Sequence, residues 1–323
     1  MLQRAPTINV KPYEGTRLCG DILQNMTSTS GTSLDTPSIL SPRQQAALLR
    51  FRDILPQMRE QWLLKRHFPY FVIDSFLPAE FAEAIHQSYP PPDELGWDRT
   101  TYTHQRRKFT LTSGFPPPIK EFFDLTAHSD FRALISQATD VENVLDDPDL
   151  VGGGLHQILR GGFLDVHVDF NFHPRTKLHR RMNLLIYMNK EWRESYQGSL
   201  ELWNMQTRQQ IETVAPIFNR AVMFETNEVS YHGHPKPLDC PQNVTRKSLA
   251  IYYYTADRES SATATEHNTL YKQTTGASGY AKTAMSSATA IAERMRDEGI
   301  ASVGATMAGK IARRLRKLPP ENK

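Results

Sequence analysis

A series of short segments between residues 154 and 255 limits the fold more than any other feature of this sequence. The segments are rich in Ile, Val, Leu, Tyr and Phe, and turn-forming residues separate them. Closely spaced strands of this kind favour a β-sandwich or barrel over a parallel α/β sheet. The candidate strands are 155–160, 163–170, 182–189, 198–205, 209–215, 220–226 and 248–255.

The region before these strands has mainly helical character. Ser41 is expected to cap a helix that starts at Pro42, and Pro56 is expected to kink or split that helix. A buried strand is predicted over 69–74 and a second strand over 104–114. Three more helices are expected within 76–90, 116–128 and 130–140, because apolar residues recur there three and four positions apart.

These patterns divide the chain into four parts. Residues 1–40 contain few large apolar side chains and are expected to form a disordered arm. Residues 41–150 are predicted to be a helical N-terminal support region, and residues 151–257 the barrel. Residues 258–323 are predicted to be a linker followed by a helical basic tail. This tail is interpreted either as a solvated helix or as a surface helix that docks on a partner or an anionic membrane; its thin apolar face favours the first.

Composition excludes several classes of protein. The net charge of the 323-residue chain is only +3, so nucleic acid is not an expected partner. The two cysteines, Cys19 and Cys240, lie far apart and are interpreted as ordinary thiols rather than as a disulfide or zinc site. We find neither a signal-like N-terminus nor a transmembrane segment, and predict a soluble, cytoplasmic protein. The oligomeric state is not determined by the sequence.

The pattern His167-Val168-Asp169 lies inside a predicted strand, where residues two apart face the same side. Taken alone, such a pair is more often structural or solvated. Two later residues change this interpretation: His232, which follows the predicted strand 220–226, and Arg246, which begins the last strand. Two histidines and one carboxylate leave open metal positions, as in non-haem Fe(II) oxygenases, and an arginine fork suits a carboxylate cosubstrate.

On these residues, the region 155–255 resembles the catalytic domain of the prolyl 4-hydroxylase-type 2-oxoglutarate/Fe(II) dioxygenases. The upstream stretch FPYFVIDSFLPAEFAEAIHQSYP resembles the lead-in of many members, including those that hydroxylate a ribosomal-protein proline, so the likeness extends over 67–256. The resemblance implies a mainly β fold with flanking helices, a double-stranded β-helix (jelly-roll or cupin-like barrel). It also implies Fe(II), 2-oxoglutarate and dioxygen, with ascorbate as an optional reductant. The matching segments are GGFLDVHVDF, NLLIYMNKEW, GSLELWN, FETNEVSYHGHPKPL and TRKSLAIYYYT.

The resemblance also implies roles for individual residues. His167, Asp169 and His232 would be the iron ligands, Arg246 would bind the far carboxylate of 2-oxoglutarate, and Tyr187 would reach the same carboxylate. By strand parity, three further residues are expected to line the pocket: Asn183 and Leu185 beside Tyr187, and Ser248 beside Arg246.

The chain between His232 and Arg246 is longer than in compact family members. It contains His234, which strand parity cannot distinguish from His232 as a ligand. The S-x-H-G context matches the distal ligand of the family and favours His232, which is expected at the end of a strand and as the least rigidly placed ligand.

Other conspicuous residues receive structural interpretations. His173 and His179 lie in a polar segment and are predicted to be solvated loop residues. Trp203 and the run 252–254 are expected to pack in the core or behind the site. The glycines 152–154 and 161–162 lack phosphate-loop spacing and are interpreted as turns or bulges.

Three function hypotheses follow. The first is a hydroxylase that acts on an unactivated C–H bond of a prolyl residue in a protein. The second is the same chemistry on a free amino acid, peptide or other small metabolite, and the third is a catalytically silent β-barrel binding module. A zinc hydrolase would leave Arg246 and Tyr187 without a role. Asp169, which the family's halogenases lack, favours hydroxylation, with desaturation and ring formation left open.

Overall fold

The computed structural model describes residues 40–64, 66–99, 102–258, 265–272, 274 and 287–288. The predicted arm, apart from Leu40, and most of the predicted linker and tail lie outside these residues, as does Cys19. The predictions for those parts therefore stay predictions.

The described strands form one antiparallel sheet that curls into a nearly closed barrel, in the order β1-β7-β4-β9-β3-β8-β5-β6, while β2 and β10 pair with β3. The long strand β3 pairs with β9 along its first half and with β8 along its second half, so it contributes to both walls. This is the predicted double-stranded β-helix with flanking helices, and the predicted fold class is confirmed. The strands are β1 (Tyr70–Ile73), β2 (Gln105–Leu111), β3 (Gly154–Val168), β4 (His179–Tyr187), β5 (Leu200–Asn204), β6 (Gln209–Val214), β7 (Arg220–Glu225), β8 (Tyr231–His234), β9 (Arg246–Thr255) and β10 (Leu270–Tyr271).

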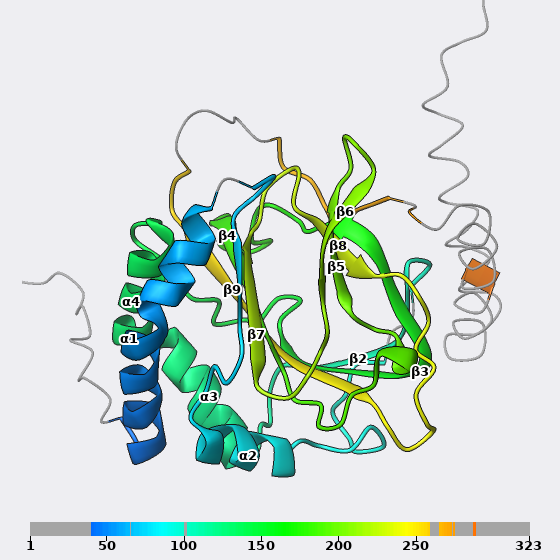
Figure 1. Cartoon of the computed structure of the whole chain (residues 1–323), viewed down its shortest axis with the longest axis horizontal. Coiled ribbons are helices and arrows are strands. Elements are labelled where there is room, and N and C mark those ends of the chain that lie inside the picture. The colour runs from blue at the N-terminus through cyan, green and yellow to red at the C-terminus, as the bar shows by residue number, and fades with distance from the viewer. Residues whose placement is uncertain are drawn as a thin grey trace, which may run out of the picture. The chain divides into compact units, whose positions relative to one another are not determined.

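Four helices lie together against the wall that contains β7, β4 and β9 (Figure 1). They are α1 (Pro42–Leu63), α2 (Ala79–Gln87), α3 (Pro117–Ala127) and α4 (Ser129–Thr139). The Ser41 side chain accepts a hydrogen bond from the Gln44 backbone N–H at 3.3 Å, and Gln44 Oε1 accepts one from the Ser41 backbone N–H at 2.8 Å, so the N-terminus of α1 is capped reciprocally. The helix continues through Pro56, and the prediction that this proline splits it is wrong.

Alternation along β4 and β9 separates the core from the cavity. Buried residues such as Leu184 and Ile186 of β4 and Ile251 of β9 pack in one cluster with the helices. The residues between them, including Asn183 and Leu185, face the opposite side of the wall, where the cavity lies. The helices therefore support the back of the wall whose front carries the site.

One edge of β3 is covered by two short strands from opposite ends of the chain. Strand β2 pairs with residues 155–158 and 163–164, and β10 pairs with Val168 and His167. Between the two parts of the β2 ladder, Gly161 has φ +76° and Gly162 has no room for a Cβ, which would lie 2.5 Å from Ile158 Cγ2. The predicted bulge interpretation of these glycines is correct.

Three details differ from the sequence-based expectations. The segments 155–160 and 163–170 belong largely to a single strand, β3. Strand β8 was not predicted, and β10 lies in the stretch predicted to be a linker, so the linker prediction is wrong for Leu270 and Tyr271.

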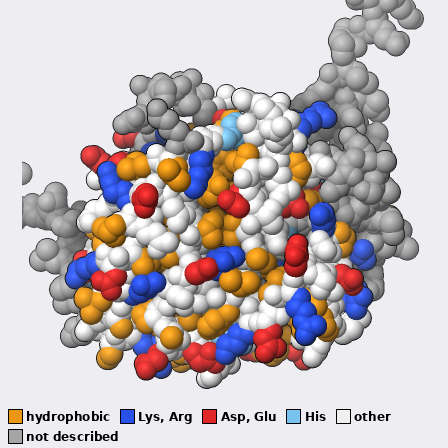
Figure 2. All heavy atoms as spheres, viewed as in Figure 1, with side chains coloured by type: hydrophobic (Ala, Val, Ile, Leu, Met, Phe, Trp, Pro, Cys, Tyr) orange, Lys and Arg blue, Asp and Glu red, His pale blue; other side chains and the backbone are white. Residues whose placement is uncertain are grey.

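Two surface features bear on the expected partners. None of the described helices combines the length and hydropathy that crossing a membrane requires. On the face shown in Figure 2, basic and acidic side chains of the described residues are interspersed, and that face carries no extended patch of one sign.

Candidate metal and carboxylate site

Two neighbouring strands bring the three predicted metal ligands together. His167 lies near the end of β3, Asp169 follows that strand directly, and His232 lies in β8 opposite His167. His232 is also paired on its other side, with Leu202 of β5. The expectation that His232 sits at a loosely held strand end is therefore wrong, since its backbone lies between two strands.

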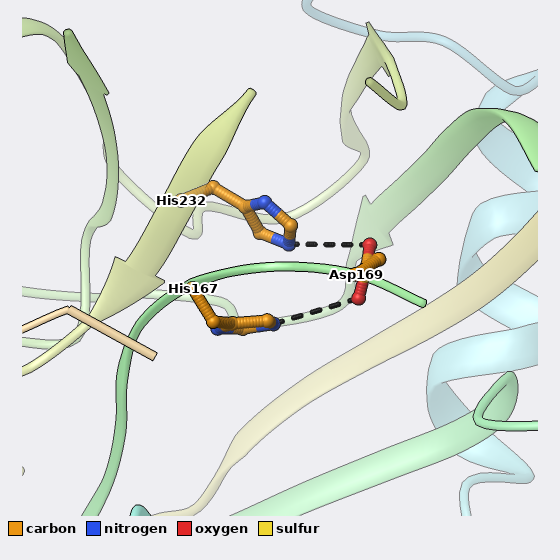
Figure 3. Close-up of side chains that lie close together, drawn as sticks. All are labelled: His167, Asp169 and His232. Carbon is orange, nitrogen blue, oxygen red and sulfur yellow. Dashed lines mark ion pairs between the residues drawn. The ribbon is translucent and has the colours of Figure 1, made fainter. Parts of the chain in front are cut away.

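The ligand atoms of these three residues, here called the inner cluster, converge on one point (Figure 3). One Asp169 oxygen lies 3.5 Å from His167 Nε2, and the other lies 3.5 Å from His232 Nε2. All three side chains are buried, and one ligand atom from each lies within 4.8 Å of the other two. This spacing can accommodate one metal ion.

The backbone fixes which nitrogen of each imidazole carries the proton. His167 Nδ1 lies 2.7 Å from the Asp165 carbonyl oxygen, and His232 Nδ1 lies 3.0 Å from that of Ser230. A carbonyl oxygen only accepts, so both Nδ1 atoms donate, and in the neutral form of each ring the lone pair lies on the Nε2 that faces Asp169. Burial lowers the pKa of His232 to about 4, which keeps this imidazole neutral at neutral pH. This is the tautomer that metal coordination requires.

Asp169 is held by Arg180, which the sequence reasoning missed, and by Asn183, which it placed in the pocket. Arg180 Nη2 donates to Asp169 Oδ2 at 2.8 Å, and Asn183 donates to the same oxygen at 3.3 Å. The guanidinium of Arg180 lies 3.5 Å over the ring of Tyr252 and 4.5 Å from that of Phe170. Burial by itself would raise the pKa of Asp169, but the Arg180 guanidinium is the main opposing cause and the pKa lies well below its usual range. Asp169 is therefore an anion whose Oδ2 is already engaged.

Arg246 is a second charged residue of the cavity, besides Asp169 and Arg180. Its Nε donates to the Gly198 carbonyl at 2.7 Å and its Nη2 donates to the Tyr187 hydroxyl at 3.3 Å. Gly198 allows this approach, because a Cβ there would lie 3.2 Å from Arg246 Cδ. Among the described residues no carboxylate forms an ion pair with Arg246, although the side chain is only 4% exposed. A buried guanidinium in this state suits an anionic ligand.

The remaining predicted pocket residues line the same cavity as the inner cluster and Arg246. Asn183, Leu185 and Ser248 all contribute to its wall, as strand parity predicts. Tyr187 reaches the site through its hydrogen bond to Arg246. Further lining residues, which the sequence reasoning did not select, come from β2 and from the chain around β10: Gln105, Lys108, Thr269 and Tyr271.

His234 also lines the cavity, but it does not join the inner cluster. Its backbone partner is Leu164, three residues before His167 and beyond a register shift in the β3–β8 ladder. The group of ligand atoms within 4.8 Å of one another contains His232 and leaves His234 out. The geometry thus supports the choice that strand parity left open.

The other histidine and aromatic residues meet their expectations in part. The prediction of a solvated His173 is wrong: it is 1% exposed and lies 3.2 Å from Asp147. With Asp149 these two residues form a second group, here called the loop cluster. His179 is partly exposed at the start of β4. Tyr252 lines the cavity and contacts Arg180, whereas Tyr253 and Tyr254 are fully buried.

Comparison with known families is consistent with this geometry. Residues 153–254 match the family model described as the 2OG-Fe(II) oxygenase superfamily. No curated protein sequence matches the chain.

Three solved structures are similar at low identity. A prolyl-4-hydroxylase from Pseudomonas putida is 17% identical with a TM-score of 0.47, covering 62% of this chain and 99% of its own. A prolyl hydroxylase from Trichoplax adhaerens, in complex with a hypoxia inducible factor peptide fragment, is 16% identical with a TM-score of 0.45, covering 68% and 94%. HygX from Streptomyces hygroscopicus, with nickel and 2-oxoglutarate bound, is 12% identical with a TM-score of 0.42, covering 67% and 96%. Likenesses at this level carry no argument about the substrate of this chain.

Proposed function

We propose that residues 153–254, which match the 2OG-Fe(II) oxygenase family model, form a 2-oxoglutarate- and Fe(II)-dependent oxygenase domain that hydroxylates an unactivated C–H bond, with His167, Asp169 and His232 as its iron ligands. The observation that carries the proposal is the orientation of the inner cluster. Two imidazoles whose Nδ1 atoms donate to backbone carbonyls direct their Nε2 atoms toward an ionised carboxylate in a buried cavity.

The donor set fits Fe(II). Two imidazoles and one carboxylate on one side of the ion leave further positions open, the arrangement of non-haem Fe(II) oxygenases. With 2-oxoglutarate bound, the iron would supply the chemistry by which dioxygen gives one oxygen atom to the C–H bond, forming C–OH, and the other to the cosubstrate, which becomes succinate and carbon dioxide.

The residues of the chain hold these groups in place. Arg180 and Asn183 fix Asp169 through Oδ2, which leaves Oδ1 directed to the metal position. The backbone carbonyls of residues 165 and 230 fix the two imidazole rings. These supporting contacts orient the ligands before any metal arrives.

Arg246 is proposed to bind the far carboxylate of 2-oxoglutarate. Its guanidinium is held by Gly198 and by Tyr187, and the Tyr187 hydroxyl is proposed to reach the same carboxylate. Leu185 and Ser248 line the space between Arg246 and the inner cluster, where the cosubstrate would lie. Apolar walls strengthen such a charge pair because they exclude water.

The substrate is proposed to be a prolyl residue of a protein, with a free amino acid, peptide or other small metabolite as the alternative. A cytoplasmic location and the absence of a nucleic-acid partner stay predictions. The catalytically silent binding module is disfavoured, because every residue that the chemistry needs is present at the site.

The test is succinate formation from 2-oxoglutarate by the full chain with Fe(II), with and without candidate substrates. We expect slow uncoupled turnover that His167→Ala, Asp169→Ala and His232→Ala each abolish. Lys120→Met is a matched surface control, because Lys120 lies on α3 and pairs only with Asp124 across one helical turn. The absence of iron binding and of succinate in the wild-type protein would overturn the proposal.

A further inference from the structure

One wall of the cavity is built from parts of the chain that lie outside residues 153–254. Strands β2 and β10 follow one another along the same edge of β3. Between them this wall, here called the outer wall, presents Gln105, Lys108, Thr269 and Tyr271 to the cavity. Residues 153–254 supply the proposed metal ligands and Arg246. The outer wall is therefore the part of the cavity that has no proposed role in binding the metal or 2-oxoglutarate.

A bulge in β2 turns Lys108 into the cavity. Gln105 and Lys108 are three residues apart, and in a regular strand they would face opposite sides of the sheet. Arg107 lies between them with φ +49°, and the ladder to β3 shifts register at this point. The extra residue resets the alternation, so both Gln105 and Lys108 line the cavity.

Lys108 lies level with Arg246. It pairs with Ile158 of β3, and Ile158 pairs in turn with Arg246 of β9. Residues directly paired in antiparallel strands share a face, and all three line the cavity. The two cationic residues are therefore two strand spacings apart, with Cα atoms about 10 Å from one another.

The described part of the chain does not neutralise Lys108 by direct contact. Its ammonium group makes no hydrogen bond or ion pair there, whereas Asp169 is already engaged by Arg180. Burial lowers the pKa of Lys108 to about 8, although Asp169 raises it in part. Lys108 is half-buried, and an ammonium group partly withdrawn from water without a close anion is costly to keep unless a ligand supplies one.

Tyr271 of β10 places an aromatic ring in the outer wall, next to the strand that carries Lys108. Its ring stacks on His104 at 4.3 Å and lies 5.3 Å from the ring of His167. His104 is itself fixed, because its Nδ1 donates to Asp165 at 3.0 Å. The outer wall thus combines a positioned cation with a positioned aromatic ring next to a metal ligand.

We propose that the outer wall is the site for the primary substrate and that Lys108 binds a carboxylate of that substrate. The inference rests on the proposed function, which assigns the far carboxylate of 2-oxoglutarate to Arg246; the near carboxylate would lie at the open metal positions. Lys108 then remains as the cation for an anionic group that the substrate brings. The substrate class is then the alternative named above, a carboxylate-bearing amino acid or peptide, whose target carbon would lie near Tyr271 and His167.

The experiment compares acids with their amides. The full chain, with Fe(II) and saturating 2-oxoglutarate, is given N-acetyl amino acids and short acetylated peptides, each beside its carboxamide, and succinate formation is followed. We expect at least one acid to change the rate of succinate formation at a concentration at least about tenfold lower than its amide needs. The reason is that only the acid can form a charge-assisted hydrogen bond with Lys108. Lys108→Met should remove most of this discrimination, Lys108→Arg should keep it, and Lys120→Met should leave it unchanged.

Three results would overturn the inference. The first is that, in the wild-type protein, acids and amides change the rate of succinate formation equally or not at all. The second is that the preference for the acid over its amide survives in Lys108→Met. A third is a tenfold or greater loss of 2-oxoglutarate affinity in Lys108→Met, measured anaerobically with the Fe(II) protein, which would assign the lysine to the cosubstrate. Wild-type protein that forms no succinate refutes the proposed function itself, whereas succinate formation without acid–amide discrimination refutes this inference alone. Mn(II) binding by Lys108→Met shows that the variant is folded.

Discussion

The inner cluster and the loop cluster contain the same residue types in similar proximity, yet they differ in where the imidazole carries its proton. In the inner cluster, carbonyl oxygens hold the protons of His167 and His232 at Nδ1. In the loop cluster, His173 Nδ1 accepts from the backbone N–H groups of Arg175 and Thr176 at 3.3 and 3.1 Å, so its proton lies on Nε2 and is donated to Asp147. The first arrangement offers lone pairs to a metal, and the second offers a proton to a carboxylate.

The carboxylates of the loop cluster are also satisfied within the chain. Asp147 accepts from the backbone N–H groups of Asp149 and Val151 at 3.0 and 2.9 Å, and Asp149 pairs with Arg175 at 2.7 Å. The difference shows that proximity of histidine and aspartate does not define a metal site. The groups behind the imidazole decide whether the cluster needs an ion.

The largest expected effect is the loss of a metal ligand from the inner cluster. His232→Ala should lower Mn(II) affinity at least about 100-fold, because the substitution removes a ligand rather than a supporting contact, and supporting contacts alone are worth 10- to 100-fold. Isothermal titration of the metal-free protein measures this. His234→Ala is the matched control and should retain binding. Loss of affinity in His234→Ala with retention in His232→Ala would reverse the ligand assignment.

Metal addition should stabilise the protein only through the inner cluster. At a Mn(II) concentration 100 times the dissociation constant, the free energy of unfolding should rise by about 2.7 kcal/mol, because only the folded state presents the site. Urea unfolding with and without metal measures the difference. The gain should persist in His173→Ala and disappear in His232→Ala; a gain lost in His173→Ala would mean that the loop cluster also binds the ion.

Arg180 provides an intermediate effect. Arg180→Met should weaken Mn(II) binding by about 10- to 100-fold, because Asp169 loses the donor that orients it, and this loss should outweigh the removed charge repulsion. Arg180→Lys should restore affinity only in part, since a point charge cannot replace a planar group stacked on Tyr252. Unchanged or tighter metal binding in Arg180→Met would show that Asp169 needs no such support.

The smallest effect on metal binding is expected in the loop cluster. His173→Ala should leave Mn(II) affinity within about twofold, yet lower the free energy of unfolding by about 1–3 kcal/mol, because buried Asp147 loses a hydrogen-bond donor. The same titration and urea experiments report both quantities. A change in metal affinity larger than in Arg180→Met would contradict the division between the clusters.

The sequence predicts the features that depend on regular alternation. The spacing of His167 and Asp169, and the shared face of Asn183 and Leu185, follow from the two-residue repeat of a strand. The strand pattern likewise predicts the barrel, since so many short apolar segments need a closed or layered sheet. His232 required family resemblance as well, because β8 is too short to show a pattern.

Bulges and long-range pairing account for what the sequence does not predict. Arg180 is two residues before Met182, which packs toward the helices, and only a register shift in the β4–β9 ladder turns Arg180 into the cavity. Lys108 likewise faces the cavity only because the bulge at Arg107 shifts the register of β2. Tyr271 reaches the site only because β10 pairs with β3 about a hundred residues earlier in the chain, and no local pattern encodes such a partner.

Because β10 is only two residues long, the side of the cavity that it forms should open more easily than the side formed by β8. His167 lies between β8, which the barrel holds on both sides, and β10, which pairs only with β3. Detaching Leu270 and Tyr271 breaks few contacts, whereas exposing His232 requires the barrel to unfold. Amide hydrogen exchange in β10 should therefore proceed through a local fluctuation, while the amides of β8 exchange through global unfolding. One side of the active centre can thus admit or release a molecule on a timescale at which the metal ligands remain fixed.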